Sequence, residues 1–196
     1  GADKGLKWLA AQQQDDGSYG GSYCKHAGIT ALAGLAFLAE GSTWGRGDYG
    51  DNVKKATEFL LNNTSDSTGL IATPQVSHGP MYGHGFATLF LAEVYGMTQR
   101  QEIREKLRLA IRLIVNTQND QGGWRYMPVP RDADLSVTIC QVMALRAARN
   151  AGIKVPKKTI DKAVEYTKKS QNGDGGFSYT LGSRSSAFPR SAAGVA

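Results

Sequence analysis

The sequence predicts an all-α fold, a curved stack of helical hairpins arranged in two layers. A short block with the pattern Gln-x-x-x-Gly-small-aromatic recurs, beginning at Gln13, Gln118 and Gln171. The segments on either side of each block have helical periodicity, and no segment of any length shows the alternation of polar and apolar residues that indicates a strand. A repeat of about 50 residues flanked by helices is typical of a repeat architecture.

The spacing of the blocks leaves room for one degenerate copy, which we expect at Asn62-Asn63 through Gly69, lengthened by an insertion. The whole chain, 1–196, is then a single domain of about four hairpins. The repeats are expected at roughly 1–48, 49–98, 99–153 and 154–196. Because the chain begins without Met and ends inside a helical pattern, we expect it to be a piece of a longer protein.

The first helix of each hairpin is predicted to be amphipathic. In 101–117 the apolar residues fall on one face at helical spacing, namely Ile103, Leu107, Ala110, Ile111 and Ile114. Lys, Arg and Glu occupy the other face, as expected for a helix with one solvated side. The other first helices are expected at 3–13, 51–62 and 157–170.

The second helix of each hairpin is nearly uncharged, and these helices are expected at 28–39, 84–95, 135–150 and 190–196. A helix that is apolar on all sides is buried. The second helices should therefore form an inner ring and the first helices an outer ring. The segment 64–83, with Pro74 and Pro80, is expected to be the one long irregular loop.

The net charge of the chain is +6, and part of it follows one outer helix. Four arginines recur there at every fourth position, namely Arg100, Arg104, Arg108 and Arg112. A solvated face and a surface for peripheral contact with an anionic membrane both remain open. We predict no nucleic-acid partner, because no aromatic residues interleave these arginines as single-strand binding requires. No apolar run is long enough for a membrane span.

Two cysteines, Cys24 and Cys140, provide no disulfide framework. Cys140 falls inside a helical pattern, where a buried free thiol is expected. Nothing in the composition indicates a compartment or an oligomeric state.

The repeated blocks resemble the QW motif of squalene-hopene cyclases and oxidosqualene cyclases. More broadly, the pattern resembles the α/α toroids shared by class II terpene cyclases, protein prenyltransferase β subunits and complement-type thioester proteins. The resemblance covers essentially the whole chain and implies a partial α/α toroid. In this family the Gln side chain and the aromatic ring tie an outer helix to the neighbouring inner helices.

The segment after the third block resembles the Asp-x-Asp-Asp motif of these cyclases, whose middle Asp protonates a terminal alkene or epoxide. The resemblance implies that Asp134 is the proton donor and Asp132 its partner. It implies acid-initiated cyclisation of a polyprenyl or other hydrophobic substrate, without a cofactor. Leu135 stands where the last Asp of the motif would be. The alternative is therefore a non-catalytic toroid that binds a protein or a small ligand.

The inner helices can be aligned on a small polar residue, which is Thr30, Thr88, Thr138 and Ser191 in turn. Four residues before the first three stand His26, His84 and Asp134, which we expect at one rim of a central cavity. Three interpretations remain open. Asp134 caps its helix, or His26 and His84 are catalytic and polarise Asp134, or the three bind zinc. Protein prenyltransferases carry a zinc-binding Cys where Ser136 stands here, and we predict no metal.

Aromatic and cationic side chains near this rim are the predicted substrate-binding residues, namely Trp124, Tyr126, Phe86, Phe90, Arg125 and Arg131. Aromatic faces stabilise the cationic intermediates of a cyclisation. Parallel inner helices also direct the positive ends of their dipoles to one rim. We expect this field to favour an anion at the rim and to lower the pKa of Asp134.

Overall fold

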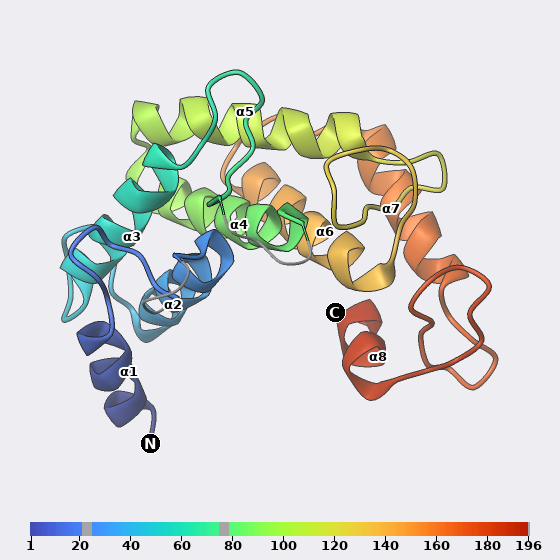
Figure 1. The fold of residues 1–196 in the computed structure, drawn as a ribbon, viewed down its shortest axis with the longest axis horizontal. Helices are drawn as coiled ribbons and strands as arrows, with labels where there is room; N and C mark the ends of the chain where they lie inside the picture. Colours follow the sequence, from blue (N-terminus) through green and yellow to red (C-terminus); the bar gives the residue numbers. More distant parts are fainter. Residues whose placement is uncertain (21–24, 75–78, 196) are drawn as a thin grey trace.

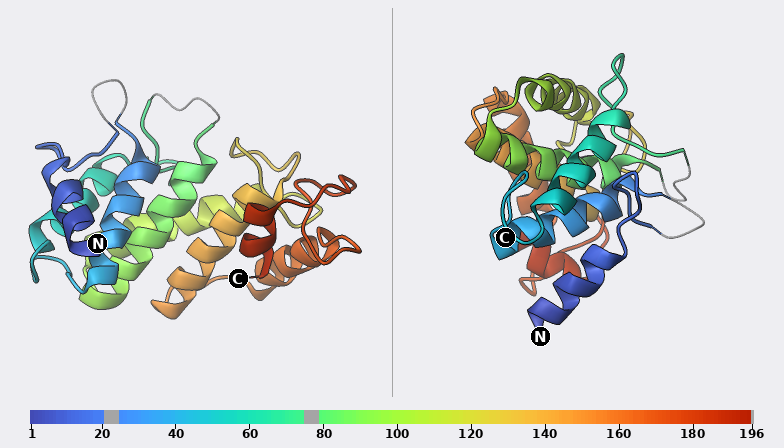
Figure 2. Two further views of the ribbon diagram at one scale, coloured as in Figure 1. Left: turned by 90° about the horizontal axis from the view of Figure 1, so that it is seen from below. Right: turned by 90° about the vertical axis from the view of Figure 1, so that its left-hand side faces the viewer.

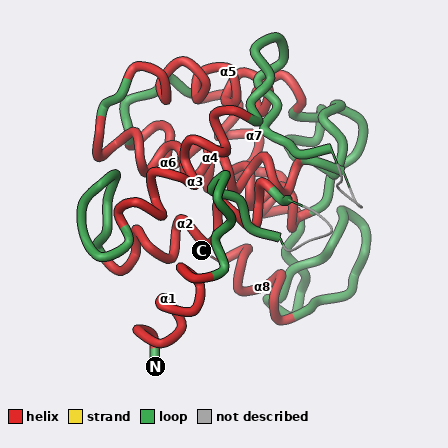
Figure 3. The backbone as a smooth tube through the Cα atoms, turned by 60° about the vertical axis from the view of Figure 1, so that its left-hand side comes forward, coloured by secondary structure: helices red, strands yellow, loops and turns green. Residues whose placement is uncertain are grey.

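The computed structural model describes residues 1–20, 25–74 and 79–195. Over these residues the chain forms eight helices and no strand, with only isolated bridges between loops (Figure 3). The helices are α1 (Ala2–Ala11), α2 (Ala27–Glu40), α3 (Gly50–Asn62), α4 (Met81–Thr98), α5 (Gln101–Thr117), α6 (Leu135–Asn150), α7 (Lys157–Lys169) and α8 (Phe188–Val195). The predicted all-α fold is confirmed. None of these helices is long and apolar enough to span a bilayer.

The helices form the two predicted layers (Figures 1 and 2). The inner layer is a row in which α2 packs on α4, α4 on α6, and α6 on α8. In the outer layer α3 contacts α2 and α4, α5 contacts α4 and α6, and α7 contacts α6. The loops that lead into α2, α4 and α6 lie along one edge of the row (Figure 2, left view). The starts of these three inner helices therefore share a rim, as predicted.

Glycines allow the inner helices to approach one another closely. A Cβ atom on Gly34 would lie 2.5 Å from the ring of Phe90, so α2 and α4 meet across the space that Gly34 leaves empty. A Cβ atom on Gly85 would lie 2.8 Å from the amide of Gln141, and the same reasoning applies to α4 and α6. Cys140, on the same contact, is a buried free thiol as predicted. Cys24 lies outside the described residues.

The segment 64–83 is less irregular than the sequence suggests. An isolated bridge joins Thr64 to Ile71, and α4 begins at Met81 instead of residue 84. Pro80 occupies the position before this helix, where its missing N–H leaves no bond unmade. Because the helix begins early, His84 lies inside α4 and not in front of it.

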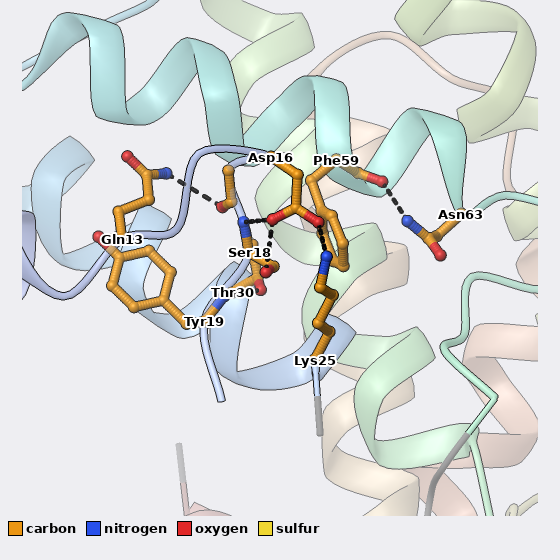
Figure 4. A network of polar contacts seen from close by, with 9 residues as sticks. Gln13, Asp16, Ser18, Tyr19, Lys25, Thr30, Phe59 and Asn63 are labelled. Atoms are coloured by element: carbon orange, nitrogen blue, oxygen red, sulfur yellow. Dashed lines mark hydrogen bonds and ion pairs between the residues drawn. The ribbon is translucent and has the colours of Figure 1, made fainter. Parts of the chain in front are cut away.

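The first block shows how the repeats are joined. The side-chain amide of Gln13 donates to the carbonyl of Gly17 at 3.1 Å and to the carbonyl of Asn52 in α3 at 3.0 Å. The backbone N–H of Tyr19 donates to Oγ1 of Thr30 in α2 at 2.9 Å (Figure 4). One block therefore ties its own inner helix to the outer helix of the next hairpin.

At the expected degenerate second block, the residue that forms a bridge differs from the expected first residue. Thr64, not Asn63, forms the bridge that corresponds to the one Gln171 forms with Phe177. The side chain of Asn63 instead donates to the carbonyl of Phe59, at the end of its own helix (Figure 4). The sequence pattern does not identify Thr64, because its side chain has no amide like that of the Gln in the other blocks.

Candidate functional site

Asp134 is the residue before α6, and its side chain caps that helix. Its backbone is extended, with φ −132° and ψ 159°, and Oδ1 accepts a hydrogen bond from the N–H of Val137 at 2.9 Å. Its own N–H donates to the carbonyl of Trp124 at 3.0 Å. The capping interpretation of Asp134 is confirmed, and the third block fixes the position of the residue.

Trp124 holds this end of the block in place. Its backbone N–H donates to Oγ1 of Thr138 at 3.0 Å, and its indole Nε1 donates to the carbonyl of Ile114 in α5 at 2.8 Å. The side chain is 1% exposed. Trp124 therefore lies in the core between the two layers and forms a rigid base for Asp134.

The second carboxylate oxygen of Asp134 is buried and has no hydrogen-bond partner. The side chain is 0% exposed, and Oδ2 makes no hydrogen bond of ordinary geometry. The Nε of Arg125 lies 3.9 Å from this oxygen, while its Nη1 donates to Oδ2 of Asp132 at 2.8 Å. Asp132 is thus the hydrogen-bonded ion-pair partner of Arg125. Asp134 interacts with the same guanidinium only at a longer distance, without a hydrogen bond.

Tyrosines surround this carboxyl group. The hydroxyls of Tyr126 and Tyr179 are hydrogen-bonded to each other, and the rings of Tyr126 and Tyr82 are 6.0 Å apart between centroids. The guanidinium of Arg125 lies 5.2 Å above the ring of Tyr126. The cluster therefore combines one buried acid, one arginine and three aromatic rings that come from three loops and helices.

Burial raises the pKa of Asp134 above its ordinary value. The Val137 amide, the charge of Arg125 and the nearby Tyr179 hydroxyl oppose this rise without cancelling it. The expectation that the helix dipole lowers this pKa is wrong, because removal of the carboxyl group from water outweighs the dipole. Asp134 therefore holds its proton more readily than an exposed aspartic acid does.

Comparison with protein families matches residues 2–188 to the prenyltransferase alpha-alpha toroid domain. The chain belongs to this family. The match and the two helical layers confirm the predicted partial toroid. A comparison with curated proteins finds no significant match. The family assignment defines the fold of this toroid, and the choice of reaction depends on the side chains.

His26 is the second capping residue at the rim of the toroid. Its Nδ1 accepts from the N–H of Gly28 at 3.1 Å and faces that of Ile29 at 3.4 Å. Burial lowers the pKa of His26, so the ring stays neutral and keeps this acceptor at neutral pH. The residue therefore does at the start of α2 what Asp134 does at the start of α6.

His84 does not lie at the rim that the sequence alignment predicts. The side chain is fully buried in the toroid, where Nδ1 accepts from the N–H of Ile71 at 3.1 Å and Nε2 faces the carbonyl of Ala110 in α5 at 3.3 Å. Because Nδ1 is an acceptor, Nε2 carries the hydrogen and donates to Ala110. Burial lowers the pKa of His84 to about 4. Both nitrogens are thus used by backbone groups.

The zinc interpretation has no ligand set in the part of the toroid that the structure describes. No three His, Cys, Asp or Glu side chains are placed there to hold one ion. His26 uses Nδ1, and His84 uses both ring nitrogens, for backbone contacts. Ser136 lies next to Tyr82 and supplies no soft ligand.

Of the other predicted substrate-binding residues, some lie near the Asp134 cluster and some lie elsewhere. Phe86 is half-buried and lies one helical turn after Tyr82 on α4, close to the rim. Phe90 is fully buried against Gly34, and Arg131 is exposed in the loop before α6. The structure therefore groups the acid with Arg125 and Tyr126, while Phe90 serves the core.

Tyr179 is the member of the cluster that sequence reasoning missed. It follows Phe177 at the same distance at which Tyr126 follows Trp124, so aligning the third and fourth repeats would have identified it. Its carbonyl also accepts from the N–H of Leu135 at 2.8 Å. The fourth repeat thus covers the start of α6 and supplies part of the site.

Proposed function

We propose that this toroid carries out acid-initiated cyclisation of a polyprenyl substrate, with Asp134 as the proton donor. The observation that supports the proposal is the buried Oδ2 of Asp134, which has no hydrogen-bond partner and belongs to a carboxyl group whose pKa is raised. A carboxyl group whose pKa is raised by burial keeps its proton to a higher pH than an exposed one, which is the property that a proton donor needs.

In this proposal the proton on Oδ2 moves to a terminal alkene carbon and leaves a tertiary cation on the substrate. Ring closure moves the cation along the chain, and loss of a proton to water at the end forms a new alkene. Asp134 takes up a proton from water again, which completes the cycle. The reaction is therefore an isomerisation and needs no co-reactant. The rings of Tyr82, Tyr126 and Tyr179 would stabilise the cation through their faces.

The role of Asp132 follows from its partner. Its carboxylate is paired with Arg125 at 2.8 Å and holds that guanidinium beside Asp134. We assign Asp132 a positioning role, because its carboxylate accepts a hydrogen bond from Arg125 and so is engaged by that guanidinium. Arg125 would then stabilise the carboxylate that Asp134 becomes after it has donated its proton.

A non-catalytic toroid is the second candidate, and one observation favours it. Leu135, which replaces the last acid of the cyclase motif, is fully buried in an apolar cluster with Tyr166 and Phe177. Asp134 also has a structural task, since it caps α6 through Val137. Packing accounts for Leu135 and capping accounts for Asp134 without any catalytic role.

Product formation distinguishes the two candidates. The protein is incubated with squalene and with geranylgeranyl diphosphate, and the products are followed by mass spectrometry. The Asp134→Asn variant keeps a good capping residue but loses the acid, so we expect a loss of activity of about a hundredfold or more. The matched Asp132→Asn variant should lose less. Absence of product, or product that is indifferent to Asp134→Asn, would favour the non-catalytic toroid.

A further inference from the structure

A groove of about 690 Å³ lies on the outer layer, between α5 and the loop that joins α6 to α7. None of the residues around Asp134 lines it. Its walls are formed by successive turns of α5, from Arg104 to Val115, and by the loop 152–156. The volume is within the range of ligand-binding pockets.

The charge of the groove is strongly positive. Arg104, Arg108 and Arg112 are exposed along α5, Lys154 is exposed on the facing loop, and Glu105 is the one acid in the lining. In the described part of the chain none of these four cations forms an ion pair. Unpaired cations therefore gather on one side of this helix.

Two cations that lie near the groove but do not line it, one before α5 and one in it, are paired. Arg100 pairs with Glu102 and lies 4.7 Å above the ring of Trp44, and Lys106 pairs with Asp66. The helix thus satisfies its cations with its own chain except along the groove. Like charges four residues apart on a helix repel one another. An anion placed along this wall would offset the repulsion between the three arginines.

The floor between the charges is aliphatic. Ile111 and Ile153 are 3% and 6% exposed, and Leu109, Val115 and Pro156 complete the apolar part of the lining. The apolar surface is recessed behind the arginines, so a ligand must carry apolar groups into the groove while its charges stay at the edge.

We propose that this groove binds an acidic, extended segment of a partner protein in which aliphatic residues alternate with carboxylates. Arginines four residues apart on a helix are displaced by about 6 Å along its axis. Alternate side chains of an extended peptide repeat at about 6.6 Å. Carboxylates at every second position therefore match the arginines, and the residues between them face the aliphatic floor.

Three other kinds of anionic partner fit the groove less well. A single-stranded nucleic acid has a similar charge spacing, but its bases stack on aromatic rings and the lining contains none. A bilayer surface needs protruding apolar side chains, whereas Ile111 and Ile153 are recessed. A fatty acid carries one charge and would leave two of the three arginines unpaired.

Fluorescence anisotropy tests the proposal with a fluorescein-labelled seven-residue peptide of alternating Glu and Leu, compared with a labelled hepta-glutamate. The groove variant combines Arg104→Gln, Arg108→Gln and Arg112→Gln. The control variant combines Lys158→Gln, Lys168→Gln and Lys169→Gln, which removes the same charge from exposed positions of α7. Circular dichroism confirms that both variants are folded.

We expect the alternating peptide to bind the unmodified protein and the control variant within about twofold of each other, and the groove variant at least about tenfold more weakly. Hepta-glutamate should bind more weakly than the alternating peptide. Equal losses in both variants, equal binding of both peptides, or no binding of the alternating peptide would overturn the proposal. Binding to phosphatidylserine vesicles, lost in the groove variant and without peptide binding, would identify a membrane instead. The cyclisation assay is a separate readout, because the groove contains no residue of the Asp134 cluster.

Discussion

The side-chain amide of Gln118 donates a 2.9 Å hydrogen bond to the carbonyl oxygen of Thr159, in the outer helix of the next hairpin. It donates at the same distance to the carbonyl of Gly122 in its own block. Gln13 makes the matching pair of bonds to Gly17 and Asn52. One amide therefore joins successive hairpins, which explains why this residue recurs in the sequence.

Replacing Gln118 should destabilise the protein more than replacing Gln171. The amide of Gln171 makes one exposed bond of 3.3 Å, to Gly175. At about 1 kcal/mol for each net hydrogen bond, Gln118→Ala should lower the free energy of unfolding by about 1–2 kcal/mol. Gln171→Ala should lower it by less than about 0.5 kcal/mol. Urea denaturation measures both, and equal losses would show that the link to Thr159 contributes nothing.

The glycines of the blocks provide a second matched pair. Gly122 and Gly175 both have positive φ, +98° and +83°. Alanine at either position should therefore cost about 1 kcal/mol in backbone strain. A Cβ atom on Gly122 would also overlap the carbonyl of Lys162 in α7, whereas one on Gly175 has nothing within 4 Å.

We therefore expect Gly122→Ala to cost about 1–3 kcal/mol more than Gly175→Ala. The difference isolates the close approach of the block to the neighbouring outer helix, since the backbone strain is common to both. Thermal and urea unfolding of the two variants measure it. Identical stabilities would mean that α7 moves aside without cost.

The buried His84 should make the protein less stable as the pH falls. Its pKa is about 4 in the folded state and 6.5 as the ordinary value. The unfolded chain therefore takes up a proton first, and stability is lost as the pH falls from about 6.5 towards 4. The loss from this one group amounts to about 3 kcal/mol over that range.

The variant His84→Gln should be less stable at pH 8, since it disturbs the bonds to Ile71 and Ala110, but its stability should depend less on pH. His26→Asn serves for comparison. It removes the other histidine whose pKa is lowered, while Asn keeps the helix cap, so its effect on the pH dependence can be set beside that of His84→Gln. Urea titrations between pH 5 and 8 give the slopes. Parallel slopes for the unmodified protein and His84→Gln would show that the buried ring accepts a charge at little cost.

Asp134 should act in the opposite direction. Its folded pKa is raised above 3.8, so the folded state keeps the proton longer than the unfolded chain does. The stability that this provides is complete below pH 3.8 and is lost as the pH rises through the folded pKa. Asp134→Asn should therefore gain stability relative to the unmodified protein as the pH rises from 3.8 through the folded pKa of Asp134. A constant difference would mean that the carboxyl group ionises freely in the fold.

The repeated Gln blocks predicted the fold because their chemistry is local. Each block needs a glycine that can adopt a positive φ and a Gln whose amide reaches two backbone carbonyls. Few residue types meet these requirements, so the same residues recur in the blocks at Gln13 and Gln118. The second repeat escaped the pattern at Thr64, where a bridge to Ile71 keeps the shape without the amide. Element boundaries differed by up to three residues, as at Met81.

The site was only partly predictable. Asp134 was found from its position before α6, since capping and the acid motif both need a carboxylate there. The orientation of His84 was not, because the same alignment position faces the outer layer once α4 begins one turn earlier. Tyr179 comes from another repeat, and the pairing of Asp132 with Arg125 depends on how a loop folds back. The repeat spacing carried a signal for Tyr179, but no local spacing indicates the pairing of Asp132 with Arg125.

Isotope labelling tests the central claim, that Asp134 starts a reaction by protonating an alkene. The protein is incubated in D₂O with squalene, and with geranylgeranyl diphosphate in parallel, and each product is analysed by mass spectrometry. We predict a cyclised product that carries one deuterium at the less substituted carbon of the former terminal alkene and that disappears with Asp134→Asn but not with Asp132→Asn. A cyclised product without deuterium, or one formed equally well by the Asp134→Asn variant, would contradict it.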